Sequence, residues 1–154
     1  MKITLLAVSR LGRTPEGALA LDYAQRATAS GRSLGLGPVE VAEVEARRPG
    51  KDAEAAVLLP HLADTHVVAC DERGRAYRSR ELAGRLAALR DGGTRRVAFV
   101  VGGADGLAPS VLEAADERLA FGPQTWPHAL VRVMLAEQVY RAVTILAGSP
   151  YHRD

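Results

Sequence analysis

The sequence of 154 residues is poor in cysteine, in lysine and in net charge. Its single cysteine, Cys70, excludes an intramolecular disulfide framework and a multi-cysteine metal site. Lys2 and Lys51 are the only lysines among 20 basic residues, and 18 acidic residues leave a net charge of +2. That balance alone does not indicate a nucleic-acid-binding protein. The abundance of arginine suits bidentate phosphate contacts, although a GC-rich genome is the better explanation because it also accounts for the abundant alanine.

Long apolar runs are also absent, which excludes an ordinary membrane-spanning helix. The N-terminus has some features of a secretory signal, namely Lys2, a short apolar run and small residues at 18–20. The run ITLLAV is too short for a signal core, however, and Arg10 and Arg13 follow it directly. We therefore expect a buried first strand in a cytoplasmic protein that forms one domain over residues 1–154.

Short apolar segments alternate with segments that have helical periodicity. This alternation predicts an α/β domain with a mostly parallel sheet. Ser79 is the expected cap of a helix that carries Leu82, Leu86 and Leu89 on one face. The apolar face of the last helix indicates core packing or a dimer seam. Strands are predicted at 3–8, 39–44, 66–70, 97–101 and 118–121, a polar turn at 71–75, and helices at 51–62, 80–91, 109–117 and 127–146. Residues 19–29 belong to a further predicted helix that ends near Gly31.

The usual motifs of nucleotide and metal chemistry are missing. The turn after the first strand has no G-x-G-x-x-G, and the loop GGADG at 102–106 lacks the Lys-Ser/Thr of a phosphate loop. The histidines His61, His66, His128 and His152 lack close ligand spacing, so no metal site is expected. No G-x-S-x-G is present. Spacing alone leaves a small ligand-binding α/β protein whose glycine loop is equally consistent with a helix cap.

Three segments, in this order, narrow the choice: FVVGGADGLAP at 99–109, WPHALVRVMLAEQVY at 126–140 and PYHR at 150–153. Together they resemble the ribosomal large-subunit methyltransferase H family, the pseudouridine N3-methyltransferases of the SPOUT superfamily. The resemblance covers nearly the whole chain and is loosest over residues 27–64. Supporting matches lie at 2–8, 23–26 and 70–82.

The resemblance implies a SPOUT-type trefoil-knotted α/β fold, with a mostly parallel sheet flanked by helices. It also implies that S-adenosylmethionine (SAM) is the cofactor and that no metal is needed. Glycines let a backbone approach such a ligand closely. The cofactor-binding residues carried over from the family are Cys70, Gly102, Gly103, Phe121, Gly122, Pro123, Gln124, Thr125 and Trp126.

The implied reaction is N3-methylation of pseudouridine-1915 in helix 69 of the 23S rRNA, within the assembled 70S ribosome. The implied partner is a second copy of the chain, whose tail completes the site. His152 and Arg153 are the expected catalytic residues, and Tyr151 and His128 the expected substrate contacts. For His152 a catalytic base and an RNA contact both remain open, and His128 is also consistent with a structural role. Arginines expected either to meet phosphates or to be solvated are Arg10, Arg13, Arg26 and those at 73–80.

Three departures from the family pattern leave an alternative open. Cys70 stands where the family has leucine, Pro123 lacks an N–H in the cofactor segment, and residues 44–64 are shortened. The alternative is a non-catalytic ribosome- or RNA-binding module with the same fold. A nucleotide-binding enzyme of another class is a weaker alternative, since phosphate motifs are absent.

Overall fold

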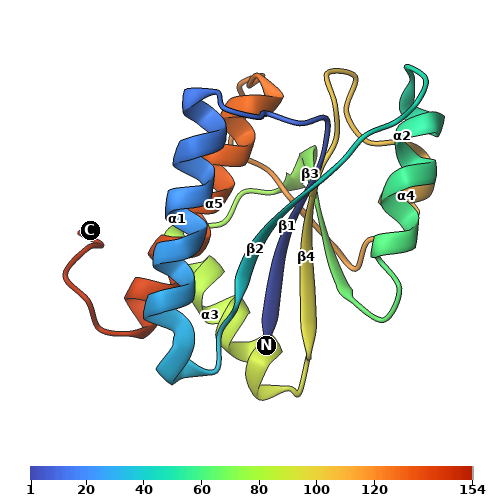
Figure 1. Ribbon diagram of the computed structural model, residues 1–154. Helices are drawn as coiled ribbons and strands as arrows, with labels where there is room; N and C mark the ends of the chain where they lie inside the picture. Colours follow the sequence, from blue (N-terminus) through green and yellow to red (C-terminus); the bar gives the residue numbers. More distant parts are fainter. Residues whose placement is uncertain (154) are drawn as a thin grey trace.

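A computed structural model describes residues 1–153 and contains one five-stranded sheet (Figure 1). The strands are β1 (Lys2–Val8), β2 (Val39–Val44), β3 (His66–Arg75), β4 (Arg96–Val101) and β5 (Glu117–Leu119). Their order is β2-β1-β4-β3-β5, and every neighbouring pair is parallel. Strand β4 is buried at every position after Arg96, as expected for a central strand covered on both faces.

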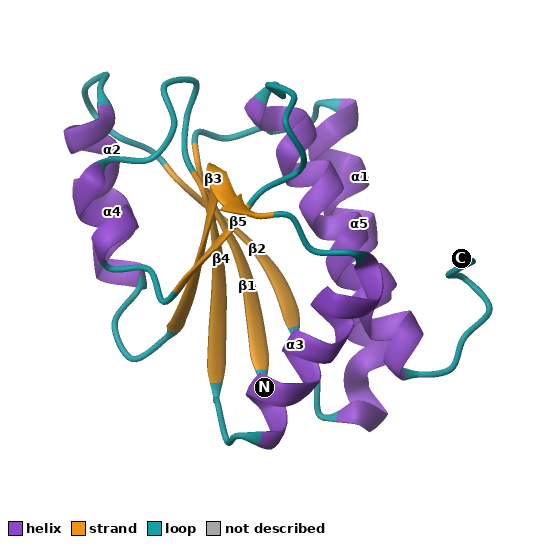
Figure 2. Ribbon diagram, turned by 180° about the vertical axis from the view of Figure 1, so that it is seen from behind, coloured by secondary structure: helices purple, strands orange, loops and turns teal. Residues whose placement is uncertain are grey.

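Helices cover both faces of this sheet. Helices α1 (Pro15–Gly31), α3 (Ser79–Asp91) and α5 (His128–Leu146) lie on one face, and α2 (Lys51–Leu58) and α4 (Pro109–Glu113) lie on the other (Figure 2). Short 3-10 helices, Arg32–Leu34 and Leu59–His61, follow α1 and α2. Two apolar cores result, one around Phe99 and Leu135 and the other around Leu6, Val100 and Val111. The predicted α/β class with a parallel sheet is confirmed.

The polar turn predicted after the third strand is wrong. Strand β3 continues through these residues to Arg75, and the residues between Cys70 and Arg75 bulge outward because both positions pair with Leu119. The Ala120 N–H donates to the Arg75 carbonyl at 3.0 Å. A Cβ on Gly74 would lie 2.7 Å from the backbone of Arg118 and Leu119, so only glycine fits this crossing. Polarity misled the prediction because the segment gains its partner from a distant strand.

Two helix boundaries also differ from the prediction. Helix α4 ends at Glu113 rather than at Glu117, because Glu117 is the first residue of β5. The Asp116 carboxylate accepts from the Val67 N–H at 2.7 Å, which joins this turn to β3. Ser79 is the first residue of α3 rather than its cap, and the Arg78 N–H donates to the Glu81 carboxylate at 2.7 Å.

A single carboxylate joins β5 to β3 and α3. Glu117 accepts from Arg85 Nε at 2.8 Å, from the Tyr77 hydroxyl at 3.0 Å, and contacts His66 Nε2 at 2.6 Å. Burial opposes ionisation of this group, but the hydrogen bonds from Arg85, His66 and Tyr77 outweigh burial and lower the pKa of Glu117. Its ionised form therefore stabilises the fold.

We expect Glu117→Gln to lower the free energy of unfolding at neutral pH by about 1–3 kcal/mol, since a charged acceptor is lost. The lowered pKa means that this contribution is complete above pH 4.5, the ordinary value, and disappears as the pH falls through the folded-state pKa. The difference between the two proteins in urea unfolding should therefore shrink on acidification. A difference independent of pH would contradict this, and Glu72→Gln, at an exposed position of β3, is the control.

Candidate cofactor and catalytic site

The cofactor-binding residues expected from the resemblance lie at one edge of the sheet. Because all strands are parallel, the segments after β1, β4 and β5 leave the sheet at its carboxyl edge. Cys70 pairs with Leu119, directly before the 120–127 segment, and Ala69 pairs with Val100, directly before the glycine loop. The tertiary structure thus collects three segments that are far apart in the sequence.

The glycine loop at 102–106 is a tight turn in which the Gly103 carbonyl accepts from the Gly106 N–H at 3.1 Å. A Cβ on Gly102 would lie 2.7 Å from the backbone of Gly106, and a Cβ on Gly103 would lie 2.5 Å from the Glu54 carboxylate. Contacts within the chain therefore favour glycine at both positions. The glycine pattern, which the resemblance interprets as room for the cofactor, also reflects the folding of the loop itself.

The segment at 120–127 is largely exposed, from Pro123 to Pro127. Trp126 is 40% exposed, and its indole N–H donates to the Phe121 carbonyl at 3.1 Å, which closes the segment into a loop. Gly122 has a φ of +91°, a conformation that favours glycine. Pro127 precedes the first turn of α5, so this loop ends at the start of the longest helix. His128, an expected substrate contact, is the first residue of that helix and is half-buried.

An open groove of about 480 Å³ begins at this loop and runs between α1, α3 and α5. Ala120, Phe121 and Gly122 line one part of it, while Tyr23 and Glu137 line another. Its volume falls within the usual range for small-molecule sites. The lining is mostly apolar, with Arg78 and Glu137 as the charged groups among its residues.

The C-terminal tail folds back onto α5. The Tyr151 hydroxyl donates to Glu137 at 3.0 Å, Arg141 Nε donates to the same carboxylate at 2.9 Å, and the Arg141 guanidinium lies 4.8 Å from the Tyr151 ring centre. Tyr140 packs on Tyr151 with ring centres 4.7 Å apart. Burial and the neighbouring Tyr23 and Glu137 raise the pKa of Tyr151, so its hydroxyl stays protonated. Glu137 and Arg141, one turn apart on α5, thus form an ion pair whose role in holding the tail had no signal in the sequence.

His152 is placed by the same arginine. Arg141 Nη1 lies 3.3 Å from His152 Nδ1. Because a guanidinium can only donate, Nδ1 must be the acceptor, and the proton of the neutral ring then lies on Nε2. Arg153 follows and is exposed.

Within one chain, the tail and the cofactor segment lie at different parts of α5. The 121–127 segment joins the first residue of the helix, whereas His152 contacts Arg141, about 20 Å farther along the helix axis. Figure 1 shows the tail leaving the far end of α5, away from the carboxyl edge of the sheet. His152 and Arg153 therefore lie far along α5 from the point where the 121–127 segment joins the helix, although the groove runs from Phe121 to Glu137, the residue that holds Tyr151.

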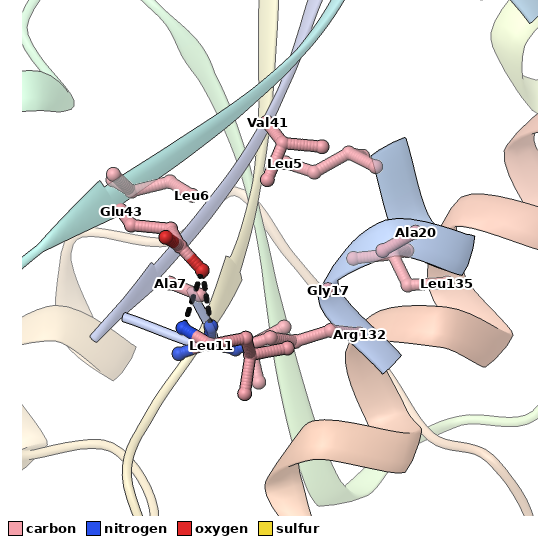
Figure 3. A pocket seen from close by; sticks show the side chains of 11 residues that line it. Leu5, Leu6, Ala7, Leu11, Gly17, Ala20, Val41, Glu43, Arg132 and Leu135 are labelled. Atoms are coloured by element: carbon pink, nitrogen blue, oxygen red, sulfur yellow. Dashed lines mark hydrogen bonds and ion pairs between the residues drawn. The ribbon is translucent and has the colours of Figure 1, made fainter. Parts of the chain in front are cut away.

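Arg132, a residue of the PHALVR motif with no role predicted from the sequence, is buried at the carboxyl ends of β1 and β2 (Figure 3). Its guanidinium donates to Glu43 at 2.9 Å, to the Ser9 carbonyl at 2.6 Å, and to the Val8 carbonyl. Glu43 also accepts from the Leu11 N–H at 3.0 Å. A cavity of about 20 Å³ adjoins the pair, and Arg132 Nε has no hydrogen-bond partner among residues 1–153. Burial lowers the pKa of Arg132, and the Glu43 charge opposes that effect.

Cys70 is half-buried, and burial raises the pKa of its thiol to about 12. The thiol therefore stays protonated at neutral pH, and a protonated thiol is a poor nucleophile. Over residues 1–153 the structure shows no group of three or more His, Cys, Asp or Glu side chains arranged for a metal ion. The same residues include no helix with the length and apolar character needed to span a membrane.

We expect Arg132→Met to lower the free energy of unfolding by about 3–5 kcal/mol, because Glu43 is left charged and unpaired in a partly buried position. Lys2→Met is the matched control, since Lys2 pairs with Glu40 across the same two strands at 2.8 Å but at an exposed position. The control should cost less than about 1 kcal/mol. Equal losses for the two variants in urea unfolding would contradict a special role for the buried pair.

Comparisons with known proteins agree with this geometry. The profile of a family described as "Predicted SPOUT methyltransferase" matches residues 1–152. The chain is 69% identical to the ribosomal RNA large subunit methyltransferase H of Caulobacter vibrioides, over 100% of this chain and 99% of that protein. It is 63% identical to the protein of the same name from Phenylobacterium zucineum, over the full length of both. A probable methylase family protein from Haemophilus influenzae Rd KW20 has a similar fold, with a TM-score of 0.57 at 16% identity, covering 99% of this chain and 70% of that one. The chain therefore belongs to the SPOUT methyltransferases, and within them to the ribosomal RNA large subunit methyltransferase H family.

Proposed function

We propose that this protein transfers a methyl group from SAM to N3 of a pseudouridine in helix 69 of the 23S rRNA, within the assembled 70S ribosome. The observation that carries the proposal is the meeting of Cys70, the glycine loop and the 120–127 segment at one sheet edge. This edge belongs to a chain that is 69% identical, over its whole length, to a ribosomal RNA large subunit methyltransferase. The alternative of a non-catalytic module requires this edge to have lost cofactor binding.

The residues at this edge fit SAM. Phe121 and Gly122 line a groove of suitable volume, and the exposed indole of Trp126 offers an apolar surface to an adenine ring. When bound, SAM supplies a methyl group on a sulfonium, which leaves as a neutral thioether. The backbone of residues 121–126 and the Cys70 strand end would hold the cofactor. Since Cys70 stays protonated, it serves this site by its position rather than as a nucleophile.

The chemistry left to the protein is removal of a proton. N3 of pseudouridine is an imide nitrogen, so it must lose its proton as the N–C bond forms and the C–S bond breaks. Arg153 is assigned to stabilise the resulting anion, because an arginine is always charged. His152 donates a hydrogen bond to RNA while Arg141 occupies its Nδ1, and it becomes a base only when that contact opens. Tyr151, whose hydroxyl is held by Glu137, is assigned to stack on a base.

We further propose that the working site is formed by two chains. The tail and the cofactor segment of one chain are separated along α5, so a homodimer in which α5 helices run past each other would join one chain's tail to its partner's cofactor loop. Exposed apolar side chains on α1 and at the start of α5, namely Leu19, Leu21, Trp126 and Leu130, support such an interface. The contact of Gly74 with Arg118 and Leu119 supports the trefoil knot, because two distant segments cross there at backbone distance. A ribosomal substrate places the protein in the cytoplasm.

The test of function uses two variants that are each inactive. Arg153→Ala should abolish methylation of 70S ribosomes, measured by mass spectrometry of the rRNA, with the SAM affinity unchanged within a few fold. Gly122→Trp should abolish SAM binding, because it fills the groove at a residue with positive φ. Mixed subunits of the two variants should regain activity, since one intact cofactor loop meets one intact tail. No recovery in verified mixed dimers would place both parts of the site in one chain.

Calorimetry with the unaltered protein separates the enzyme from the non-catalytic module. Binding of SAM together with methylation of ribosomes supports the enzyme. Absence of both, in a protein that still binds ribosomes, would favour the module.

RNA contact is assigned to arginines beside the cofactor edge. The Ser9 N–H donates to the Val44 carbonyl at 2.8 Å, so the loops after β1 and β2 begin side by side. The first loop carries Arg10 and Arg13, and the second carries Arg47 and Arg48, all exposed. Arginines placed next to a reaction site are suited to hold phosphates of an RNA substrate.

We expect charge reversal at Arg47 and Arg48 to lower kcat/KM on ribosomes about tenfold and to reduce the salt dependence of binding, since phosphate contacts release counterions. The affinity for SAM should not change. Arg95 and Arg96 are the matched control, because they are also a tandem exposed pair but lie at the opposite, amino end of β4. Equal losses of kcat/KM from the two reversals would show that the activity depends on the net charge of the protein and not on the position of the arginines.

A further inference from the structure

A carboxylate from α2 occupies the inner side of the glycine loop. The Gly103 N–H donates to Glu54 Oε2 at 3.2 Å, and a Cβ on Gly103 would lie 2.5 Å from Glu54 Oε1. Glu54 lies in the first turn of α2 and is half-buried. Its backbone N–H donates to the Gly50 carbonyl at 3.1 Å, which anchors this turn to the β2–α2 loop. Helix α2 thus reaches across from β2 to the loop that follows β4.

This contact changes the explanation of the glycine pair. A hydrogen bond from a backbone N–H to a carboxylate is among the stronger ones, and it takes Gly103 N–H away from any other acceptor. The Glu54 carboxylate also fills the space into which a side chain at position 103 would point. Gly103 thus leaves room for the Glu54 carboxylate against the backbone, and a side chain at 103 would have to displace that carboxylate.

We propose that Glu54 is a positioning residue for the cofactor: its carboxylate holds the Gly103 N–H and thereby fixes the shape of the 102–106 loop. The proposal rests on the proposed function, since it takes this loop to be part of the SAM site. It also gives the 44–64 region a role, because that region supplies the helix that carries Glu54. The Gly103 carbonyl, bonded to the Gly106 N–H, closes the same turn from its other side.

The test is a double-mutant cycle with SAM affinity, measured by calorimetry on the full-length protein. Glu54→Ala should raise the Kd for SAM about tenfold, the loss expected for one hydrogen bond to a charged acceptor. Glu54→Gln should stay within about threefold of the unaltered protein, because an amide oxygen still accepts from Gly103 N–H. Asp52→Ala, which removes an exposed carboxylate from the same helix turn, is the control and should have no effect.

Gly103→Ala is the second substitution of the double-mutant cycle. In the unaltered background its new Cβ displaces the Glu54 carboxylate, so it should weaken SAM binding as much as Glu54→Ala does. In the Glu54→Ala background the space is vacant, and the second substitution should add little. Additive losses would overturn the proposal, because they would mean that Gly103 meets the cofactor directly. Unchanged affinity in Glu54→Ala would also overturn it.

Failure of the proposed function gives a different result. If the unaltered protein binds no SAM, the function itself fails, and thermal unfolding then replaces affinity as the readout of the cycle. Non-additive losses of stability in Glu54→Ala and Gly103→Ala would still show that Glu54 fixes the loop. Additive losses would overturn that role as well.

Discussion

The buried guanidinium of Arg132 joins helix α5 to the carboxyl ends of strands β1 and β2. It projects from the second turn of α5 and binds the backbone at the end of β1 and the Glu43 side chain of β2. Since α5 begins directly after the 120–127 loop, this contact holds that loop at a fixed position above the sheet edge. A buried charge is costly, and it persists here because carbonyl and carboxylate oxygens replace the water it has lost.

Helix α5 fixes the positions of both the 120–127 loop and the C-terminal tail. Its first turn adjoins the cofactor segment, and Glu137 and Arg141 in its second half bind the tail. The tail therefore stays near the far end of α5, away from the point where the 120–127 loop enters the helix. In the proposed homodimer, the tail of the second chain would meet this loop.

Two contacts within the chain constrain the shape of the glycine loop. Its own turn requires glycine at 102, where the backbone of Gly106 approaches closely, and glycine at 103 leaves room for the Glu54 carboxylate. A loop whose shape is already fixed by contacts within the chain loses little conformational entropy when a ligand binds. Such a loop is therefore suited to a cofactor that has to be released and replaced in every cycle.

The sequence by itself determined the α/β class, the positions of most strands and the family, because apolar runs and short motifs are local patterns that survive without coordinates. Strand β4 and helix α5 lie within a residue of their predicted bounds. The tertiary structure alone decided that residues 71–75 extend a strand, since their partner Leu119 is remote in the sequence. It alone showed that Arg132, Glu54 and Arg141 hold the loops and the tail, because a polar side chain has no periodic signature and its partner is chosen only when the chain has folded. For the same reason, the separation of His152 from the cofactor edge could be read only from the path of α5.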